Sequence, residues 1–261
     1  MTLAFLAVLA ALGFVGAFVA SMLGIGGAIV MLPLLLYTPP LLGFGALDVK
    51  TVAGITMTQV LFGSLTGLLM HRRLHAVSLD LALATGPAMA AGTLVGALAS
   101  GWMRGRMVLI VYALMATSGA MMMIVPSQSV DPEILGGPPR FNRGMAAAGA
   151  GGVGLLAGVV GAGGAFLILP LLVVVLRMPL RGAIGTSLAI AAMGAVSGFL
   201  GKLVTGQIVA SVTLPVLAGA IAAAPLGAAA SHRLSVRSLR TALFVVLVSA
   251  AAGVWYDLLA R

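Results

Sequence analysis

Charged residues divide the chain into long apolar runs. The runs cover residues 1–47, 51–70, 81–103 and 107–130, and then 144–176, 182–201, 203–232 and 241–256. Because about 20 apolar residues cross the hydrocarbon core of a bilayer as a helix, most of these runs suit one membrane-spanning helix. The pattern predicts an all-α polytopic membrane protein.

Residues 144–176 do not suit a single span. One helix of that length reaches roughly 50 Å against a core of about 30 Å, and two full spans need about 40 residues. The cluster Gly161–Gly164 lies in the middle of the run. A hairpin of two shorter helices that bends at the glycines resolves the conflict, and the same interpretation suits residues 3–22 and 27–43.

A glycine-rich stretch occurs twice with the same spacing. Gly24-Ile25-Gly26-Gly27-Ala28 precedes Leu32-Pro33-Leu34, and Gly161-Ala162-Gly163-Gly164-Ala165 precedes Leu169-Pro170-Leu171. Glycines in apolar segments can be helix-packing faces. Paired interruptions in corresponding positions of two halves are also the sequence pointer to a transporter substrate site.

Further matches indicate a duplication. A shift of 131 residues places Gly54, Gly63, Gly96 and Arg106 on Gly185, Gly194, Gly227 and Arg237. The shift at the glycine-rich stretches is 137 residues. The expected organisation is a first transmembrane repeat over residues 1–126, a polar linker over 127–143 and a second repeat over 144–261.

The distribution of basic residues predicts that the repeats are inverted. Each repeat has about five helical segments, and an odd number turns the second repeat upside down. Nine basic residues then lie on one side and five on the other, an asymmetry that favours inversion and places both termini outside the cytoplasm. The nine are Arg72, Arg73, Arg140, Arg143, Arg177, Arg181, Arg233, Arg237 and Arg240, and the five are Lys50, Arg104, Arg106, Lys202 and Arg261.

The composition agrees with a membrane location. Hydrophobic residues make up 61% of the chain and charged residues 7%, whereas a soluble domain carries about 25% charged residues. The formal net charge of +9 is explained by loops that orient the protein among membrane lipids, so no nucleic-acid partner is expected. The first residues lack a basic region and predict a retained helix. We expect a multi-pass protein of the cytoplasmic membrane. The sequence does not determine its oligomeric state.

The positions of the carboxylates in the sequence argue against cation transport. Asp48, Asp80, Asp131, Glu133 and Asp257 fall at predicted span ends or in loops. Buried carboxylates serve many ion-coupled carriers as relays or ligands, and this chain is predicted to have none. No Lys or Arg is expected in mid-span either. Lys202 ends a span, where a snorkelling side chain is favoured over a role at a pore mouth.

The hydrogen-bond donors predicted in the membrane interior suit an anion. New helices are expected to begin near Ala28 and Ala165, and a helix N-terminus presents free amides and the positive end of its dipole. Hydroxyl and amide side chains of the following segment add donors, although such Thr and Ser often bond their own helix or a neighbouring one. The candidate substrate-binding residues are Gly24, Gly26, Gly27, Thr56, Gln59, Gly161, Gly163, Gly164, Thr186 and Ser187.

These features resemble the sulfite exporter TauE/SafE family of bacterial membrane permeases. The resemblance lies in the two glycine-rich stretches with their Leu-Pro-Leu sequences and in Ala183-Ile184-Gly185-Thr186-Ser187-Leu188, and it covers nearly the whole chain. At the matching place the first repeat reads Ala53-Gly54-Ile55-Thr56-Met57, which differs from the family's pattern. The resemblance therefore implies a substrate-binding role less strongly for Thr56 than for Ser187. The resemblance implies transport of sulfite, sulfonates such as sulfoacetate, or related sulfur-containing anions.

Other functions find little support in the sequence. Motifs of the Gly-x-Ser-x-Gly, His-Glu-x-x-His and Walker types are absent, and so is cysteine. We expect no enzyme activity, no cofactor and no metal. The alternative to a permease of small sulfur-containing anions is a non-transporting membrane scaffold or assembly protein, in which the glycine breaks only pack helices.

Overall fold

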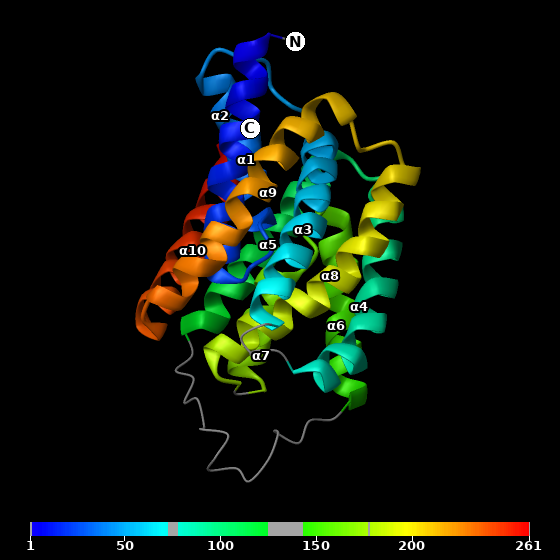
Figure 1. Ribbon diagram of the computed structural model, residues 1–261. Helices are drawn as coiled ribbons and strands as arrows, with labels where there is room; N and C mark the ends of the chain where they lie inside the picture. The colour runs from blue at the N-terminus through cyan, green and yellow to red at the C-terminus, as the bar shows by residue number, and fades with distance from the viewer. Residues whose placement is uncertain (1, 73–77, 125–142, 177, 261) are drawn as a thin grey trace.

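The computed structural model describes residues 2–72, 78–124, 143–176 and 178–260, and within these ranges the chain forms ten α-helices and no strand (Figure 1). The first five are α1 (Leu3–Leu23), α2 (Ala28–Leu41), α3 (Val49–Arg72), α4 (Leu79–Ala99) and α5 (Gly105–Ile124). The second five are α6 (Arg143–Val160), α7 (Ala165–Val174), α8 (Leu180–Val204), α9 (Ala210–Arg233) and α10 (Val236–Ala260). The predicted all-α class is confirmed.

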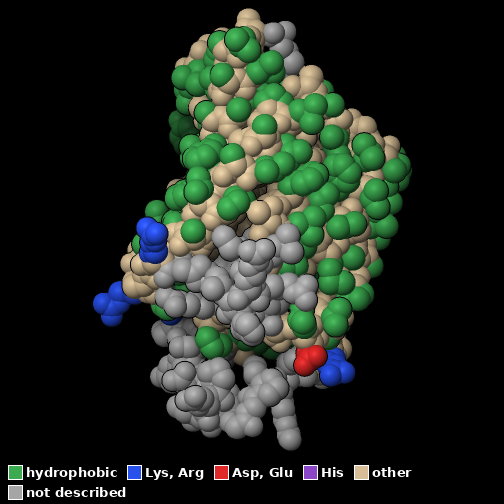
Figure 2. All heavy atoms as spheres, viewed as in Figure 1, with side chains coloured by type: hydrophobic (Ala, Val, Ile, Leu, Met, Phe, Trp, Pro, Cys, Tyr) green, Lys and Arg blue, Asp and Glu red, His purple; other side chains and the backbone are tan. Residues whose placement is uncertain are grey.

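Much of the bundle surface is hydrophobic. Seven helices of the described chain are long and apolar enough to cross a membrane: α1, α4, α5, α6, α9, α10 and the part of α8 from Gly182. Large apolar side chains such as Leu83, Leu114 and Met121 are more than half exposed. On the face shown in Figure 2, hydrophobic side chains cover the upper and middle parts, and the Lys and Arg side chains lie toward the lower end. A bilayer is the solvent that accepts such a surface, so the protein is a multi-pass membrane protein.

Both predicted hairpins form. Helices α1 and α2 are joined at Gly24–Gly27, and α6 and α7 at Gly161–Gly164. The second arms have 14 and 10 residues, which is roughly 21 Å and 15 Å of helix. Neither second arm crosses the hydrocarbon core, so each hairpin brings its glycine turn into the interior of the bundle.

The packing of the two halves is reciprocal. Helix α1 packs along α9, and its counterpart α6 packs along α4, while α3 packs on α8 and α5 on α10. A methyl group on Gly96 would overlap the carbonyl oxygen of Leu155, and one on Gly227 would overlap that of Phe18. The repeat shifts relate Gly96 to Gly227 and Phe18 to Leu155. The same close helix contact therefore occurs twice, as a duplicated chain requires.

The direction of the two halves agrees with inversion. In Figure 1, α1 begins at the end where both termini lie, whereas α6 begins at the opposite end. This arrangement supports the inverted repeat, which stays a prediction for the protein in its bilayer. The predicted linker falls almost wholly on residues 125–142, outside the described ranges, so the division into 1–126, 127–143 and 144–261 also stays a prediction.

Candidate functional site

The first glycine turn uses conformations that favour glycine. Gly24, Gly26 and Gly27 have φ angles of 70°, 74° and 102°. The amide of Ile25 donates to the Ala20 carbonyl over 3.1 Å and so closes the end of α1. The Gly27 carbonyl accepts from Met31 over 3.0 Å and so opens α2. Side chains with a Cβ resist this backbone, which explains why three glycines stand within four residues.

The second turn repeats these bonds. Gly161, Gly163 and Gly164 have φ angles of 80°, 58° and 76°. Helix α6 ends with a bond of 2.8 Å from Ala162 to the Ala157 carbonyl, and the Gly164 carbonyl opens α7 by accepting from Ile168 over 2.9 Å. Each bond joins the positions that the shift of 137 residues relates. The duplicated sequence therefore builds the same helix end and the same helix start twice.

The two turns meet inside the bundle. A methyl group on Gly26 would lie 3.0 Å from the Cβ of Ala165, the first residue of α7. Val60 of α3 lies between Gly26 of the first turn and Gly163 of the second turn. Its Cγ1 lies against the positions where these two glycines would carry a side chain. Gly26, Ala165 and Val60 are completely or almost completely buried. The starts of α2 and α7, whose first amides have no intrahelical partners, thus approach one another.

Gln59 is the polar side chain at the first turn. A methyl group on Gly27 would lie 2.8 Å from Gln59 Nε2. The side chain is 2% exposed, and its Oε1 is buried without a hydrogen-bond partner. An unsatisfied buried acceptor costs about 1–3 kcal/mol, so packing alone does not favour glutamine here.

A small cavity lies beside Gln59. Its volume is about 10 Å³, which is room for about one water molecule. It is lined by Ala17, Ala20, Ser21, Gly26, Gln59, Gly63 and Leu188. An oxyanion is several times larger than water, so this conformation is closed around the turn.

Ser187 is tied to the first turn. Its hydroxyl lies 3.1 Å from the Gly24 carbonyl and 2.9 Å from the Ile184 carbonyl, and it donates toward both. Thr56, the counterpart in the first repeat, donates to Ala53 in its own helix over 3.1 Å. Thr186 accepts instead from the backbone N–H of Ser78 over 3.0 Å, so its hydroxyl serves the start of α4. Gly24, Gly26, Gly27 and Gln59 thus share one region with Ser187, and Thr186 points elsewhere.

The second turn lies against α3 where the first lies against α8. A methyl group on Gly161 would overlap the Ala53 carbonyl, and one on Gly24 would overlap Ile184. The two pairs are again related by the repeat. A methyl group on Gly164 would overlap Met89, so α4 also closes over the second turn.

Two buried polar residues near the turns were not among the predicted site residues. Tyr112 of α5 is fully buried, and its hydroxyl donates to the Ile29 carbonyl. Pro33 has no N–H to bond that carbonyl, so Tyr112 supplies the missing donor. Lys202 was expected to snorkel but is completely buried. The burial of the Tyr112 hydroxyl could have been predicted, because Tyr112 lies in the middle of an apolar span and a buried hydroxyl usually finds a hydrogen-bond partner. The burial of Lys202 could not have been predicted from its position at the end of a span.

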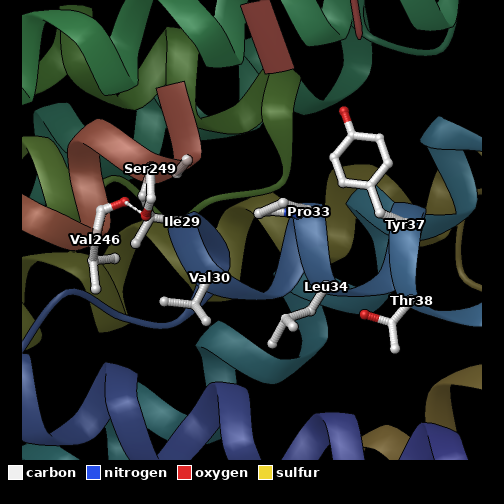
Figure 3. A pocket seen from close by; sticks show the side chains of 9 residues that line it. Ile29, Val30, Pro33, Leu34, Tyr37, Thr38, Val246 and Ser249 are labelled. Atoms are coloured by element: carbon white, nitrogen blue, oxygen red, sulfur yellow. Dashed lines mark hydrogen bonds between the residues drawn. The ribbon is translucent and has the colours of Figure 1, made fainter. Parts of the chain in front are cut away.

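A larger cavity lies between α2 and α10 (Figure 3). Its volume is about 350 Å³, and it is lined by Ile29, Val30, Pro33, Leu34, Tyr37, Thr38, Val246, Ser249 and Ala250. Figure 3 shows the Ser249 hydroxyl bonded to the Val246 carbonyl of its own helix. The lining is mostly apolar and includes no Lys or Arg, so the cavity does not suit a small anion.

The interior offers neutral donors rather than carboxylates. Among the described residues, Asp48 precedes α3, Asp80 lies in the first turn of α4, and Asp257 lies in the last turn of α10. Asp131 and Glu133 lie outside the described residues. No group of three or more His, Asp or Glu side chains in the described part of the chain is arranged to hold a metal ion. Backbone amides at helix starts, with Gln59, are chemistry that recognises anions.

Comparison with known proteins agrees with this arrangement. The family profile described as "Sulfite exporter TauE/SafE" matches residues 9–254. The chain is also 24% identical over 269 residues to the "Probable membrane transporter protein YunE" of Bacillus subtilis (strain 168), covering 96% of this chain and 97% of that protein. No solved structure gives a significant match. The chain therefore belongs to the sulfite exporter TauE/SafE family of membrane transporters.

Proposed function

We propose that this protein is a secondary transporter of small sulfur-containing anions, such as sulfite or organosulfonates of the sulfoacetate type, across the cytoplasmic membrane. The observation that carries the proposal is the contact of two glycine turns inside the bundle, each of which starts a short helix. The name of the matched family supports the sulfur-containing class of substrate. The role is transport without catalysis.

The proposed grip on the anion is made of several neutral donors. Gly26, Gly27, Gly163 and Gly164 allow the anion to approach the backbone and to meet amides at the starts of α2 and α7. The Gln59 amide group adds a side-chain donor, and Thr56 and Ser187 add hydroxyls when the turns move. Hydrogen bonds to a charged group contribute about 1.5–3 kcal/mol each. Several such bonds hold an anion and still permit its release.

The closed cavity implies a conformational change. In the described conformation the space beside Gln59 holds about one water molecule. The Ser187 hydroxyl is engaged with the Gly24 carbonyl. Loading an anion therefore requires α8 to move relative to the first turn. In an inverted repeat, the equivalent movement of α3 against the second turn opens the opposite side, which gives alternating access.

Flux into proteoliposomes tests this function. Purified protein is reconstituted, and transport of sulfite, sulfoacetate and taurine is followed, with protein-free vesicles as the control. We expect saturable flux of at least one sulfur oxyanion and none in the control vesicles. A lack of anion flux by protein that is shown to be folded would contradict it.

The scaffold alternative makes a different prediction for the glycines. If the turns serve packing alone, Gly163→Ala and Gly164→Ala lower the melting temperature, and no anion shifts the melting temperature of the wild type. An anion-dependent shift in the wild type argues against the scaffold.

A further inference from the structure

Lys202 lies in the last turn of α8 and is 0% exposed. It belongs to the stretch Gly182–Val204 that is long and apolar enough to span the membrane. A charged side chain in such a place is costly, and intramembrane ionisable residues usually face partners or a transport path. The hydrogen-bond partners and the charges around Lys202 therefore indicate its role.

The ammonium of Lys202 has three acceptors. Its Nζ lies 2.7 Å from Ser100 Oγ, 2.8 Å from Gln207 Oε1 and 3.0 Å from the Val159 carbonyl oxygen. Ser100 donates its own proton to the Ala97 carbonyl and therefore accepts from the lysine. Three acceptors match the three N–H bonds of an ammonium, since a neutral amine has two. The three hydrogen bonds therefore stabilise the charged form of the lysine.

The three hydrogen-bond partners of this cation are neutral groups. Among the residues that the structure describes, no carboxylate oxygen lies within 4.0 Å of Lys202 Nζ. The charged neighbour is a second cation, Lys50, whose Nζ donates to the Gly101 carbonyl over 2.8 Å. Two ammonium groups thus converge on the consecutive residues Ser100 and Gly101 after α4. The cluster of Lys202, Ser100 and Gln207 is satisfied in hydrogen bonds, and the protonated lysine gives it a positive charge that no described carboxylate offsets.

The cluster is attached to the second glycine turn. Val159 stands two residues before Gly161, in the last turn of α6, so Lys202 bonds one of the carbonyls at that helix end. The negative end of the α6 dipole offsets part of the charge, because a helix end is equivalent to roughly half an elementary charge. Part of the positive charge is left over, next to the turn that the proposed substrate would pass.

We propose that Lys202, with Ser100 and Gln207, is a second binding station for a small oxyanion, between the second glycine turn and the end of the bundle that carries Lys50. The arriving anion replaces the Val159 carbonyl and Gln207 Oε1 as acceptor of the ammonium, and Gln207 Nε2, now 2.9 Å from Ser100 Oγ, turns to donate to it. This inference rests on the proposed anion transport and adds to it a charged residue.

A structural role for Lys202 makes a separate prediction. A lysine that only caps α6 contributes to stability in the absence of ligand, and its loss does not alter the response to anions. A lysine that binds anions determines the anion concentration at which the protein becomes more stable. The two roles are separated when both quantities are measured on the same variants.

The test is thermal unfolding of the purified full-length protein against sulfite, sulfoacetate and sulfate, with gluconate as the control for ionic strength. The variants are Lys202→Gln, Lys202→Arg and Lys50→Gln. Arg104→Gln is the matched control, because it removes an exposed charge close to the same α4–α5 connection. We expect oxyanions to raise the wild-type melting temperature. The half-saturating concentration should rise at least tenfold in Lys202→Gln, about threefold in Lys202→Arg and Lys50→Gln, and not at all in Arg104→Gln.

The possible results distinguish an anion-binding role of Lys202 from a structural one. A lower ligand-free melting temperature in Lys202→Gln with an unchanged half-saturating concentration overturns the station and leaves the proposed function standing. If Lys202→Gln does not fold, an unchanged response in Lys50→Gln overturns it. No oxyanion response in the wild type overturns it as well. A Lys202-dependent shift of the melting temperature by these oxyanions, combined with no flux of any sulfur-containing anion, supports the station and contradicts the proposed transport function.

Discussion

The hydroxyl of Ser187 donates to the carbonyl oxygen of Gly24 over 3.1 Å and so joins α8 to the end of α1. The two residues are 163 positions apart in the chain. Gly24 is the point at which the first helix stops, so this bond holds the first glycine turn against the second repeat. A short movement of α8 would release the turn and free the hydroxyl for another acceptor.

Removing this hydroxyl should weaken substrate binding more than it weakens the fold. In Ser187→Ala we expect the anion concentration that half-saturates flux to rise roughly tenfold, because one donor and the position of the turn are lost together. Ser197→Ala is the matched control, since Ser197 donates to the Ala90 carbonyl over 2.7 Å and joins α8 to α4 away from the turn. Both variants should lose about 1 kcal/mol of stability. Equal changes in half-saturation would show that Ser187 has been misplaced in the site.

The second turn should not tolerate a side chain. Gly161 has a φ of 80°, and a methyl group there would overlap the Ala53 carbonyl. We expect Gly161→Ala to lose at least 1–3 kcal/mol from strain alone, with the overlap in addition. Gly152 lies in α6, the helix that precedes this turn, where Gly152→Ala meets no atom within 4 Å and should be neutral or stabilising by roughly 0.5–1 kcal/mol. Thermal unfolding in detergent compares the two, and a wild-type melting temperature for Gly161→Ala would refute the turn geometry.

The hairpins could be predicted from the sequence because the length of an apolar run is a property of the chain alone. Residues 144–176 were too long for one span and too short for two, and the glycines marked the bend between α6 and α7. The contact of the turns at Gly26 and Ala165 agrees with the two matched glycine-rich stretches, because two similar halves that face each other bring equivalent turns together.

The environment of individual polar residues could not be predicted in the same way. The burial of Lys202 depends on the turn after α4 reaching the end of α8, which is a tertiary contact. Thr186 and Ser187 are neighbours in sequence, but the helix directs one hydroxyl to Ser78 and the other to Gly24. No sequence pattern distinguishes these directions.

Gln59 provides a contrast between stability and function. Because its Oε1 is buried without a partner, Gln59→Met should leave the melting temperature unchanged or raise it. The same change removes the side-chain donor at the first turn and should lower anion flux at least tenfold. Thr58→Val is the control, since the Thr58 hydroxyl bonds the Gly54 carbonyl of its own helix. Full flux in Gln59→Met would remove this residue from the site.

The inverted topology has a direct test in a chain without cysteine. Single cysteines at positions 104 and 233, each exposed, should react with a membrane-impermeant thiol reagent from opposite sides of the membrane. A parallel arrangement, in which each hairpin counts as one crossing, places them on the same side. Position 143 is the internal control and should label together with position 233.

Anomalous diffraction from crystals grown with selenite locates the bound anion in the protein. Selenite is sulfite with selenium in place of sulfur, so crystals grown with it give an anomalous peak wherever the anion binds. We predict a peak between the two glycine turns, beside Gln59 and Gly26, in a conformation more open than the closed one, and a further peak at Lys202 agrees with this prediction. Peaks confined to exposed arginines at the helix ends, with none between the turns, would contradict it.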